Sequence, residues 1–130
     1  MEARPIPVKI MIVDDSPGMR AVMRALLREQ PVEFLECGDG EEAVALYAVE
    51  RPDWVLMDIR MPRLDGLGAI RRIRADHPRS RFIIVTDYDD QDLRAKAAAL
   101  GAEGYVLKDN LAPLPALLRE RIDGHLSSKE

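Results

Sequence analysis

Residues 54–66 read W-V-L-M-D-I-R-M-P-R-L-D-G. The segment 54–58 is apolar until it ends on Asp58, and this pattern predicts a fully buried strand with a carboxylate at its mouth. A carboxylate in that place is costly to remove from water unless a neighbouring group compensates its charge. A loop that carries Met61-Pro62 and Asp65-Gly66 follows, and the rest of the chain must supply the compensation.

The sequence predicts four further strands, over residues 8–13, 32–37, 81–86 and 104–107. Three of these strands end on or beside a residue that is capable of chemistry. The residues concerned are Asp14 and Asp15 after the first strand, Thr86 at the end of the third, and Lys108 after the fourth.

Segments with helical spacing of apolar residues separate the predicted strands, at about 17–29, 40–51, 67–76, 89–100 and from 111 to Gly124 or a few residues later. Ser16, followed by Pro17, and Asp39 are the expected N-caps of the first two helices. Gly101 is the expected C-terminal cap of the fourth helix.

Five units of a strand followed by a helix, with strands apolar throughout, predict an α/β fold with a mostly parallel sheet and helices on both faces. We expect one domain over residues 1–130, with its core at about 8–126. Ligands of such sheets bind at the carboxyl ends of the strands, where the winding reverses. All the chemically capable residues named above are expected at that edge.

Composition excludes several classes of function. The 130 residues carry a net charge of −4, so no direct nucleic-acid binding by this chain is expected. No apolar stretch approaches the roughly 20 residues of a membrane span, and the amino terminus lacks the apolar region of a secretion signal. Cys37 is the one cysteine and reads as a small strand residue in a reducing compartment. The expected location is the cytoplasm.

Three carboxylates at one edge, from Asp14, Asp15 and Asp58, require a cation, because each pair would repel by about 4 kcal/mol at 4 Å and an effective dielectric of 20. Oxygen ligands that are few in number suit Mg²⁺, with Mn²⁺ as a substitute, better than Zn²⁺. With Thr86 as a hydrogen-bond donor and Lys108 as a neutralising charge, Asp58 could attack a phosphoryl group in line.

The chain resembles the CheY-like receiver domain of bacterial two-component response regulators from about Val8 to Leu126. The matching pieces are I-M-I-V-D-D, V-L-M-D-I-R-M-P-R-L-D-G, I-I-V-T and G-Y-V-L-K-D. The resemblance implies a flavodoxin-like (βα)5 fold with five parallel strands in the order 2-1-3-4-5. It also implies Asp58 as the phosphorylated residue, Asp15 as a direct Mg²⁺ ligand, Asp14 as a ligand through water, and Arg60 as a ligand through its backbone carbonyl.

The resemblance also implies a switch. Thr86 corresponds to the hydroxyl that turns toward the phosphoryl group, Lys108 to the lysine that contacts it, and Tyr105 to the aromatic residue whose rotamer follows. Such a protein is not an enzyme with a separate substrate but assists its own phosphorylation and dephosphorylation. The lifetime of the phosphoryl group is expected to be tuned at Arg60 and Tyr88, which flank Asp58 and Thr86.

Two residues depart from the usual receiver pattern. Asp87 stands where a small residue usually borders the phosphoryl group, and its carboxylate could repel that group, reach the metal or point to solvent. Asp109 stands where many receivers have proline after a cis peptide bond. Without proline a cis bond costs several kcal/mol, so the bond after Lys108 is either trans or held under strain.

The expected phosphodonor is a sensor histidine kinase or a histidine phosphotransfer protein. Because the chain ends at Glu130, its output is expected to act in trans, through a partner or a phosphorylation-dependent homodimer, unless it is a piece of a longer regulator. Helix 89–100, strand 104–107 and the last helix are the expected output surface.

Two alternative functions remain open from the sequence. A phosphatase of the haloacid dehalogenase type would carry D-x-D at the nucleophile, whereas this chain has D-I-R at Asp58 and no cap domain. A receiver-like interaction module that works without phosphorylation is the other alternative, and Asp87 favours it. Stoichiometric labelling by a phosphodonor would distinguish the switch from both.

Overall fold

The computed structural model of the chain describes residues 7–29 and 31–128. Its five strands are β1 (Val8–Val13), β2 (Val32–Cys37), β3 (Trp54–Met57), β4 (Phe82–Thr86) and β5 (Tyr105–Leu107). They form one parallel sheet in the order β2-β1-β3-β4-β5. The helices are α1 (Pro17–Leu27), α2 (Gly40–Glu50), α3 (Gly66–Asp76), α4 (Gln91–Ala99) and α5 (Leu114–Ser128). The predicted fold class and strand order are therefore confirmed.

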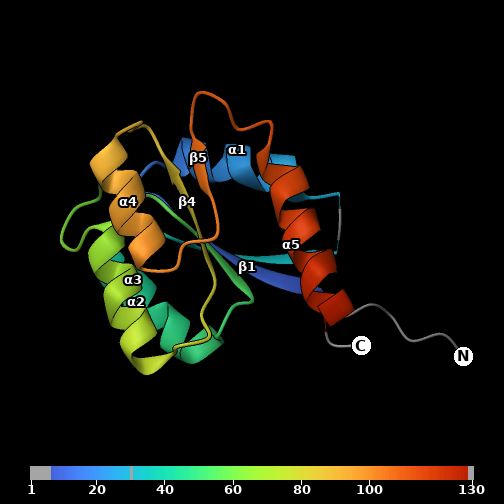
Figure 1. Cartoon of the computed structure of the whole chain (residues 1–130), viewed down its shortest axis with the longest axis horizontal. Helices are drawn as coiled ribbons and strands as arrows, with labels where there is room; N and C mark the ends of the chain where they lie inside the picture. The colour runs from blue at the N-terminus through green and yellow to red at the C-terminus, as the bar shows by residue number, and fades with distance from the viewer. Residues whose placement is uncertain (1–6, 30, 129–130) are drawn as a thin grey trace, which may run out of the picture.

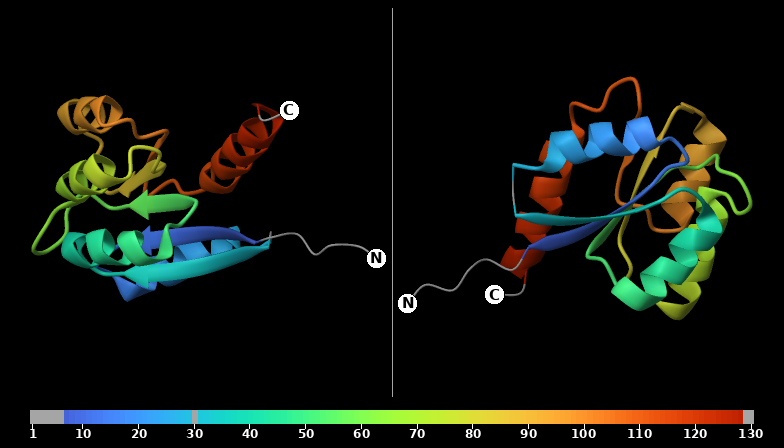
Figure 2. Two further views of the ribbon diagram at one scale, coloured as in Figure 1. Left: turned by 90° about the horizontal axis from the view of Figure 1, so that it is seen from below. Right: turned by 180° about the vertical axis from the view of Figure 1, so that it is seen from behind.

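The helices cover both faces of the sheet, as Figures 1 and 2 show. Helices α2, α3 and α4 pack on one face, against alternate strand residues such as Met11, Met57 and Ile84. Helices α1 and α5 pack on the other face, against the intervening residues such as Ile12 and Leu56. Since both faces are covered, residues of either parity are apolar in residues 10–13 of β1, in β3 and in β4 up to Val85, which explains the unbroken apolar runs there. The edge strand β2 instead carries Glu33 and Glu36.

Short polar side chains begin four of the helices. Ser16, Asp39, Asp65 and Asp90 each accept a hydrogen bond from the backbone N–H three residues later. Such caps satisfy one of the N–H groups that a helix leaves free at its start. Gly101 follows Leu100, the C-cap residue of α4, and has a φ of 87°, where a side chain would be strained. The caps expected from the sequence at Ser16, Asp39 and Gly101 are confirmed.

Most predicted boundaries lie within two residues of the observed ones, and two of the differences have a local cause. Strand β3 ends at Met57, one residue earlier than predicted. The N–H of Asp58 still donates to the carbonyl of Val13, but the next N–H, that of Ile59, donates to the Asp58 carboxylate and not to a neighbouring strand. Helix α5 begins at Leu114 and not at Leu111, which lies in a turn closed by the bond from Leu114 N to Leu111 O. Pro115 has no N–H that could bond the Leu111 carbonyl in a helix from Leu111, whereas as the second residue of α5 it stands in the first turn, where no such bond is needed.

Trp54 begins β3 at the amino edge of the sheet, opposite the edge on which the strands end. Its side chain is 2% exposed, and the guanidinium carbon of Arg81 lies 4.3 Å from the centre of its ring. Arg81 also makes two hydrogen bonds of 2.7 Å with the carboxylate of Glu103. These contacts link β3, the start of β4 and the segment before β5 at the amino edge of the sheet.

Within the described residues, none of the helices has both the length and the apolar character needed to cross a bilayer.

Candidate functional site

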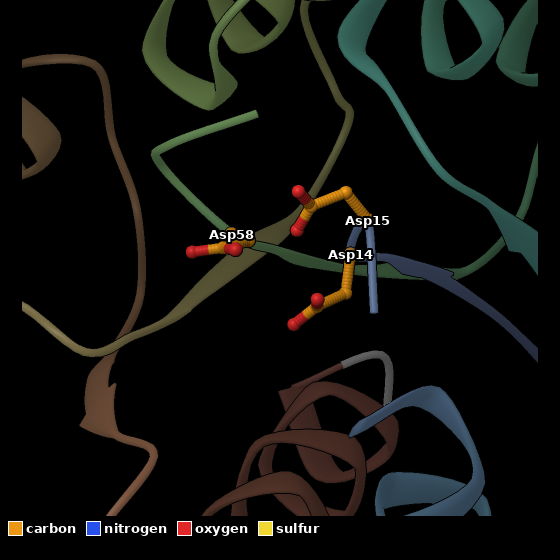
Figure 3. A group of neighbouring side chains, drawn as sticks. All are labelled: Asp14, Asp15 and Asp58. Carbon is orange, nitrogen blue, oxygen red and sulfur yellow. The ribbon is translucent and has the colours of Figure 1, made fainter. Parts of the chain in front are cut away.

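Three acidic side chains converge at the carboxyl edge of the sheet. Asp14 and Asp15 follow β1, and Asp58 follows the neighbouring strand β3. One carboxylate oxygen from each of the three lies within 4.8 Å of the others. Figure 3 shows the three side chains together beside the ends of their strands. The convergence predicted from strand order is therefore present.

Asp14 is fully buried and is held by two neighbouring elements. Its backbone N–H donates to the Cys37 carbonyl of β2 at 3.1 Å, which continues the β1–β2 ladder by one residue. Its Oδ1 accepts from the N–H of Ser16 at 2.9 Å. Its Oδ2 lies 2.7 Å from Nζ of Lys108, yet the pair lacks the angles of a hydrogen bond, which leaves Oδ2 without a hydrogen-bond partner among the described residues.

Asp58 is 4% exposed and is held in a comparable way. Its N–H donates to the carbonyl of Val13 at 3.0 Å, its Oδ1 accepts from the N–H of Ile59 at 2.8 Å, and its Oδ2 accepts from Nζ of Lys108 at 3.0 Å. A rigid strand end and two side-chain hydrogen bonds therefore fix the direction of this carboxylate.

Lys108 follows β5 and has a side chain that is 9% exposed. Burial alone would lower the pKa of its ammonium, but the carboxylates of Asp14 and Asp58 outweigh burial and raise that pKa. For Asp58 burial is the larger effect, and it raises the pKa of the carboxyl despite the nearby ammonium. The buried group of two acids and one lysine thus has an excess of negative charge.

This excess, the hydrogen-bond-free Oδ2 of Asp14 and the exposed carboxylate of Asp15 fit a divalent cation. All the available ligand atoms are carboxylate or backbone oxygens, and the burial of Asp14 and Asp58 limits how many can reach one ion. Few hard oxygen ligands, with the remaining positions filled by water, are typical of Mg²⁺. The residues present therefore fit Mg²⁺, or Mn²⁺ as its substitute.

Gly66 fixes the loop that leaves Asp58. Its N–H donates to the carbonyl of Ile59 at 2.7 Å, and a Cβ placed on it would lie 1.9 Å from the carbonyl oxygen of Asp58. No side chain fits that space, so the Asp65-Gly66 pair noted in the sequence has a steric explanation: Asp65 caps α3, and Gly66 allows α3 to begin against the back of Asp58.

Thr86 ends β4 and is fully buried. Its Oγ1 accepts a long hydrogen bond of 3.4 Å from the N–H of Tyr88, and no direct bond to Asp58 is present in the described residues. The hydroxyl of Tyr105 donates to the carbonyl of Tyr88 at 2.6 Å. Tyr88 therefore connects the two residues to which the sequence assigned a switching role.

The other residues that the sequence analysis named near the site are exposed. Asp87 is exposed and is not among the three carboxylates that meet within 4.8 Å, which agrees with the orientation toward solvent. The peptide bond between Lys108 and Asp109 is trans, so the strained alternative is wrong. The guanidinium carbon of Arg60 lies 4.7 Å from the centre of the Tyr88 ring. The two residues expected to tune the phosphoryl lifetime are thus in contact with each other.

Residues 10–119 of the sequence match the response regulator receiver domain. The chain belongs to the response regulator receiver family. Among curated proteins, this receiver domain is 36% identical over 104 residues to the transcriptional regulatory protein PdtaR of Mycobacterium tuberculosis, covering 79% of the chain and 50% of PdtaR. It is 38% identical over 118 residues to protein-glutamate methylesterase/protein-glutamine glutaminase 3 of Myxococcus xanthus, covering 87% of the chain and 33% of that protein.

Solved structures with the same fold include other receiver domains. The REC domain of AraT from Geobacillus stearothermophilus has a TM-score of 0.81 and 29% identity, over 93% of this chain and 99% of that one. The signal receiver domain of NarL from Mycobacterium tuberculosis has a TM-score of 0.78 and 30% identity, over 92% and 96%. The receiver domain described here spans between a third and a half of the length of the first curated relatives.

Sequence reasoning missed the side chain that holds the loop between β1 and α1. Arg20 of α1 donates from Nη1 to the backbone carbonyl of Asp14 at 2.6 Å. A backbone carbonyl carries no sequence signal, so the only trace available in the sequence was a basic residue in the first turn of a helix that follows two acids.

Proposed function

We propose that Asp58 is the phosphoryl acceptor of this receiver domain and that the phosphorylated form acts as a signalling switch. The observation that carries the proposal is the position of the Asp58 carboxylate, which stands at a strand end between a buried ammonium, that of Lys108, and two further acids, Asp14 and Asp15. A held carboxylate beside a cationic group is the arrangement that in-line phosphoryl transfer requires.

The transfer follows from the groups present. An oxygen of Asp58 forms a bond to phosphorus as the bond from phosphorus to a histidine nitrogen breaks, and the nitrogen leaves with the electron pair. Asp14, Asp15, Asp58 and the Arg60 carbonyl are the proposed holders of Mg²⁺, which would neutralise phosphoryl oxygens against the acids. Lys108, which already contacts Asp58, supplies a second positive charge to the same oxygens.

Thr86 and Tyr105 are the proposed readout. The long bond at the Thr86 hydroxyl is weak, which leaves this group free to turn toward a stronger acceptor such as a phosphoryl oxygen. Tyr88 is hydrogen-bonded to both Thr86 and Tyr105, so a rotation of the threonine side chain would alter the contacts of Tyr105 on β5. A two-state change of this kind alters which partner surface is presented.

The proposed output surface lies over α4, β5 and α5. A groove there is lined by residues of all three elements, including Arg94, Tyr105, Val106, Ala116 and Leu117. The proposed partners are a histidine kinase or histidine phosphotransfer protein as donor and an output partner in trans, with a phosphorylation-dependent homodimer as one form of output. The proposed setting is the cytoplasm, with residues 1–130 acting as one receiver domain.

Intact mass after incubation with acetyl phosphate and Mg²⁺ tests the proposal. The wild-type chain is expected to gain one phosphoryl group, and Asp58→Asn is expected to gain none. Asp109→Asn is the matched control, because it removes an exposed acid from the same edge and should still be labelled. Equal labelling of Asp58→Asn would place the phosphoryl group on another residue and overturn the assignment of Asp58. No labelling of a folded wild-type chain by any phosphodonor would favour a module that works without phosphorylation.

A further inference from the structure

The side chain of Arg20 joins the loop of the two acids to strand β2. Its Nη1 donates to the backbone carbonyl of Asp14 at 2.6 Å, and its Nε donates to Oε1 of Glu36 at 2.9 Å. The rigid guanidinium plane makes both bonds at once, which a lysine ammonium on a flexible stem does not reproduce. The guanidinium thus fixes the distance between β2 and the Asp14 carbonyl.

Glu36 is itself held in place. Besides Arg20 it binds Arg24, one helical turn further along α1. Partial burial would raise the pKa of the Glu36 carboxyl, but the bonds from Arg20 and Arg24 outweigh burial and keep that pKa below its ordinary value. Glu36 therefore stays ionised at neutral pH, and it immediately precedes Cys37, whose carbonyl accepts the N–H of Asp14.

The contact matters most for Asp15. In the part of the chain that the structure describes, its exposed carboxylate takes part in no hydrogen bond or ion pair, so the backbone is what holds the start of this side chain beside the other two acids. That backbone begins with the peptide group between Asp14 and Asp15, and the carbonyl of this peptide is the group that Arg20 holds. A rotation of the peptide would carry Asp15 away from Asp14 and Asp58.

We infer that Arg20, fixed by Glu36, is a positioning residue for the divalent cation at the Asp14–Asp15–Asp58 edge. The inference rests on the proposed function and adds to it a residue that touches no ligand of the cation except through the backbone. Groups that orient metal ligands in this way commonly change metal affinity 10–100-fold when they are removed.

Loss of positioning and loss of a positive charge change the affinity for the cation in opposite directions. Removing a positive charge near a cation site reduces repulsion, so a pure charge effect predicts tighter binding in an arginine variant. Loss of positioning predicts weaker binding. Arg24 is a matched control for the charge effect, since it lies on the same helix and binds the same Glu36 but makes no bond to the Asp14 carbonyl.

Calorimetric titration of the unphosphorylated chain with MnCl₂ measures the affinity without requiring any activity. Arg20→Gln is expected to bind Mn²⁺ about tenfold more weakly than wild type. Arg24→Gln is expected to bind with unchanged or slightly higher affinity. Arg20→Lys keeps the charge, loses the double contact, and is expected to bind more weakly than wild type; it carries the test if Arg20→Gln does not fold.

Equal affinities in Arg20→Gln, Arg20→Lys and Arg24→Gln, or tighter binding by Arg20→Gln, would overturn the inference while leaving the proposed function intact. Failure of the proposed function has a different signature, since the wild-type chain itself would then bind no Mn²⁺ or gain no phosphoryl mass. Thermal unfolding in EDTA shows whether each variant is folded before its titration is interpreted.

Discussion

Nζ of Lys108 lies 3.0 Å from Oδ2 of Asp58 although 50 residues separate them in the sequence. The same ammonium lies 2.7 Å from Asp14, so one positive charge serves two buried acids. This buried group destabilises the folded state, because two carboxylates share one ammonium and one negative charge is left without a counter-charge or full hydration. The stability of the domain without metal should therefore depend on the charges at this edge.

Replacement of Asp58 by Asn is expected to raise the free energy of unfolding of the metal-free protein by about 1 kcal/mol at pH 7. Burial raises the pKa of Asp58 in the folded state. The wild-type chain therefore loses stability as the pH rises from about 4, the value of an unperturbed carboxyl, through the raised folded pKa. The variant should lack this loss. Urea unfolding in EDTA at pH 4 to 8 measures it, and a difference that does not vary with pH would contradict the explanation.

Replacement of Lys108 by Ala is expected to lower the free energy of unfolding by about 3 kcal/mol in EDTA, because two buried acids lose their counter-charge. Millimolar Mg²⁺ should recover more stability in this variant than in wild type, since the cation takes over the role of the ammonium. Lys96→Ala is the control, because Lys96 forms an exposed pair with Asp92 on α4 and should cost less than about 0.5 kcal/mol.

Replacement of Gly66 by Ala is expected to cost about 3 kcal/mol, because the new methyl group would overlap the carbonyl of Asp58 and force the loop away. Labelling by acetyl phosphate should fall in the same variant. Gly18→Ala on α1 meets no atom closer than 3.8 Å and should stabilise the domain by about 0.5 kcal/mol. If both alanine variants unfolded alike, close packing behind Asp58 would not be the reason.

Replacement of Tyr105 by Phe removes the bond to the Tyr88 carbonyl and keeps the ring under Arg94. Hydrogen exchange at amides 87–90 is expected to accelerate about fivefold, which corresponds to a net loss of about 1 kcal/mol. Tyr47→Phe is the matched change, since the Tyr47 hydroxyl has no hydrogen bond in the described residues. Unaltered exchange in Tyr105→Phe would mean that this bond does not order the loop.

Most of the fold could be predicted because each element carries its own signal. Unbroken apolar runs indicate strands buried on both faces, and Ser16 and Asp39 begin helices by a local bond that needs no tertiary context. The errors lie where two local preferences compete. At Asp58 the β-forming run continues, but the carboxylate bonds the next N–H. At Leu111 the helical spacing is present, but Pro115 has no N–H to bond the Leu111 carbonyl, so the helix starts at Leu114.

The site could be predicted in composition and only partly in geometry. Strand order brings Asp14, Asp15 and Asp58 to one edge, because the carboxyl ends of parallel strands lie together. Which acid is fully buried, and that Lys108 binds two of them, depends on packing between distant segments. The contact of Arg20 with a backbone carbonyl could not be predicted, because a basic residue in the first turn of the helix is its only trace in the sequence.

The placement of Trp54 at the amino edge has a consequence for spectroscopy. It is the one tryptophan of the chain, it is buried beside Arg81, and four residues of strand place it about 13 Å from Asp58. Its emission should therefore report the loss of the folded core while staying nearly constant on addition of Mg²⁺. Fluorescence can then follow unfolding at any metal concentration without a superimposed binding signal. The stability of each variant can therefore be measured independently of its metal affinity.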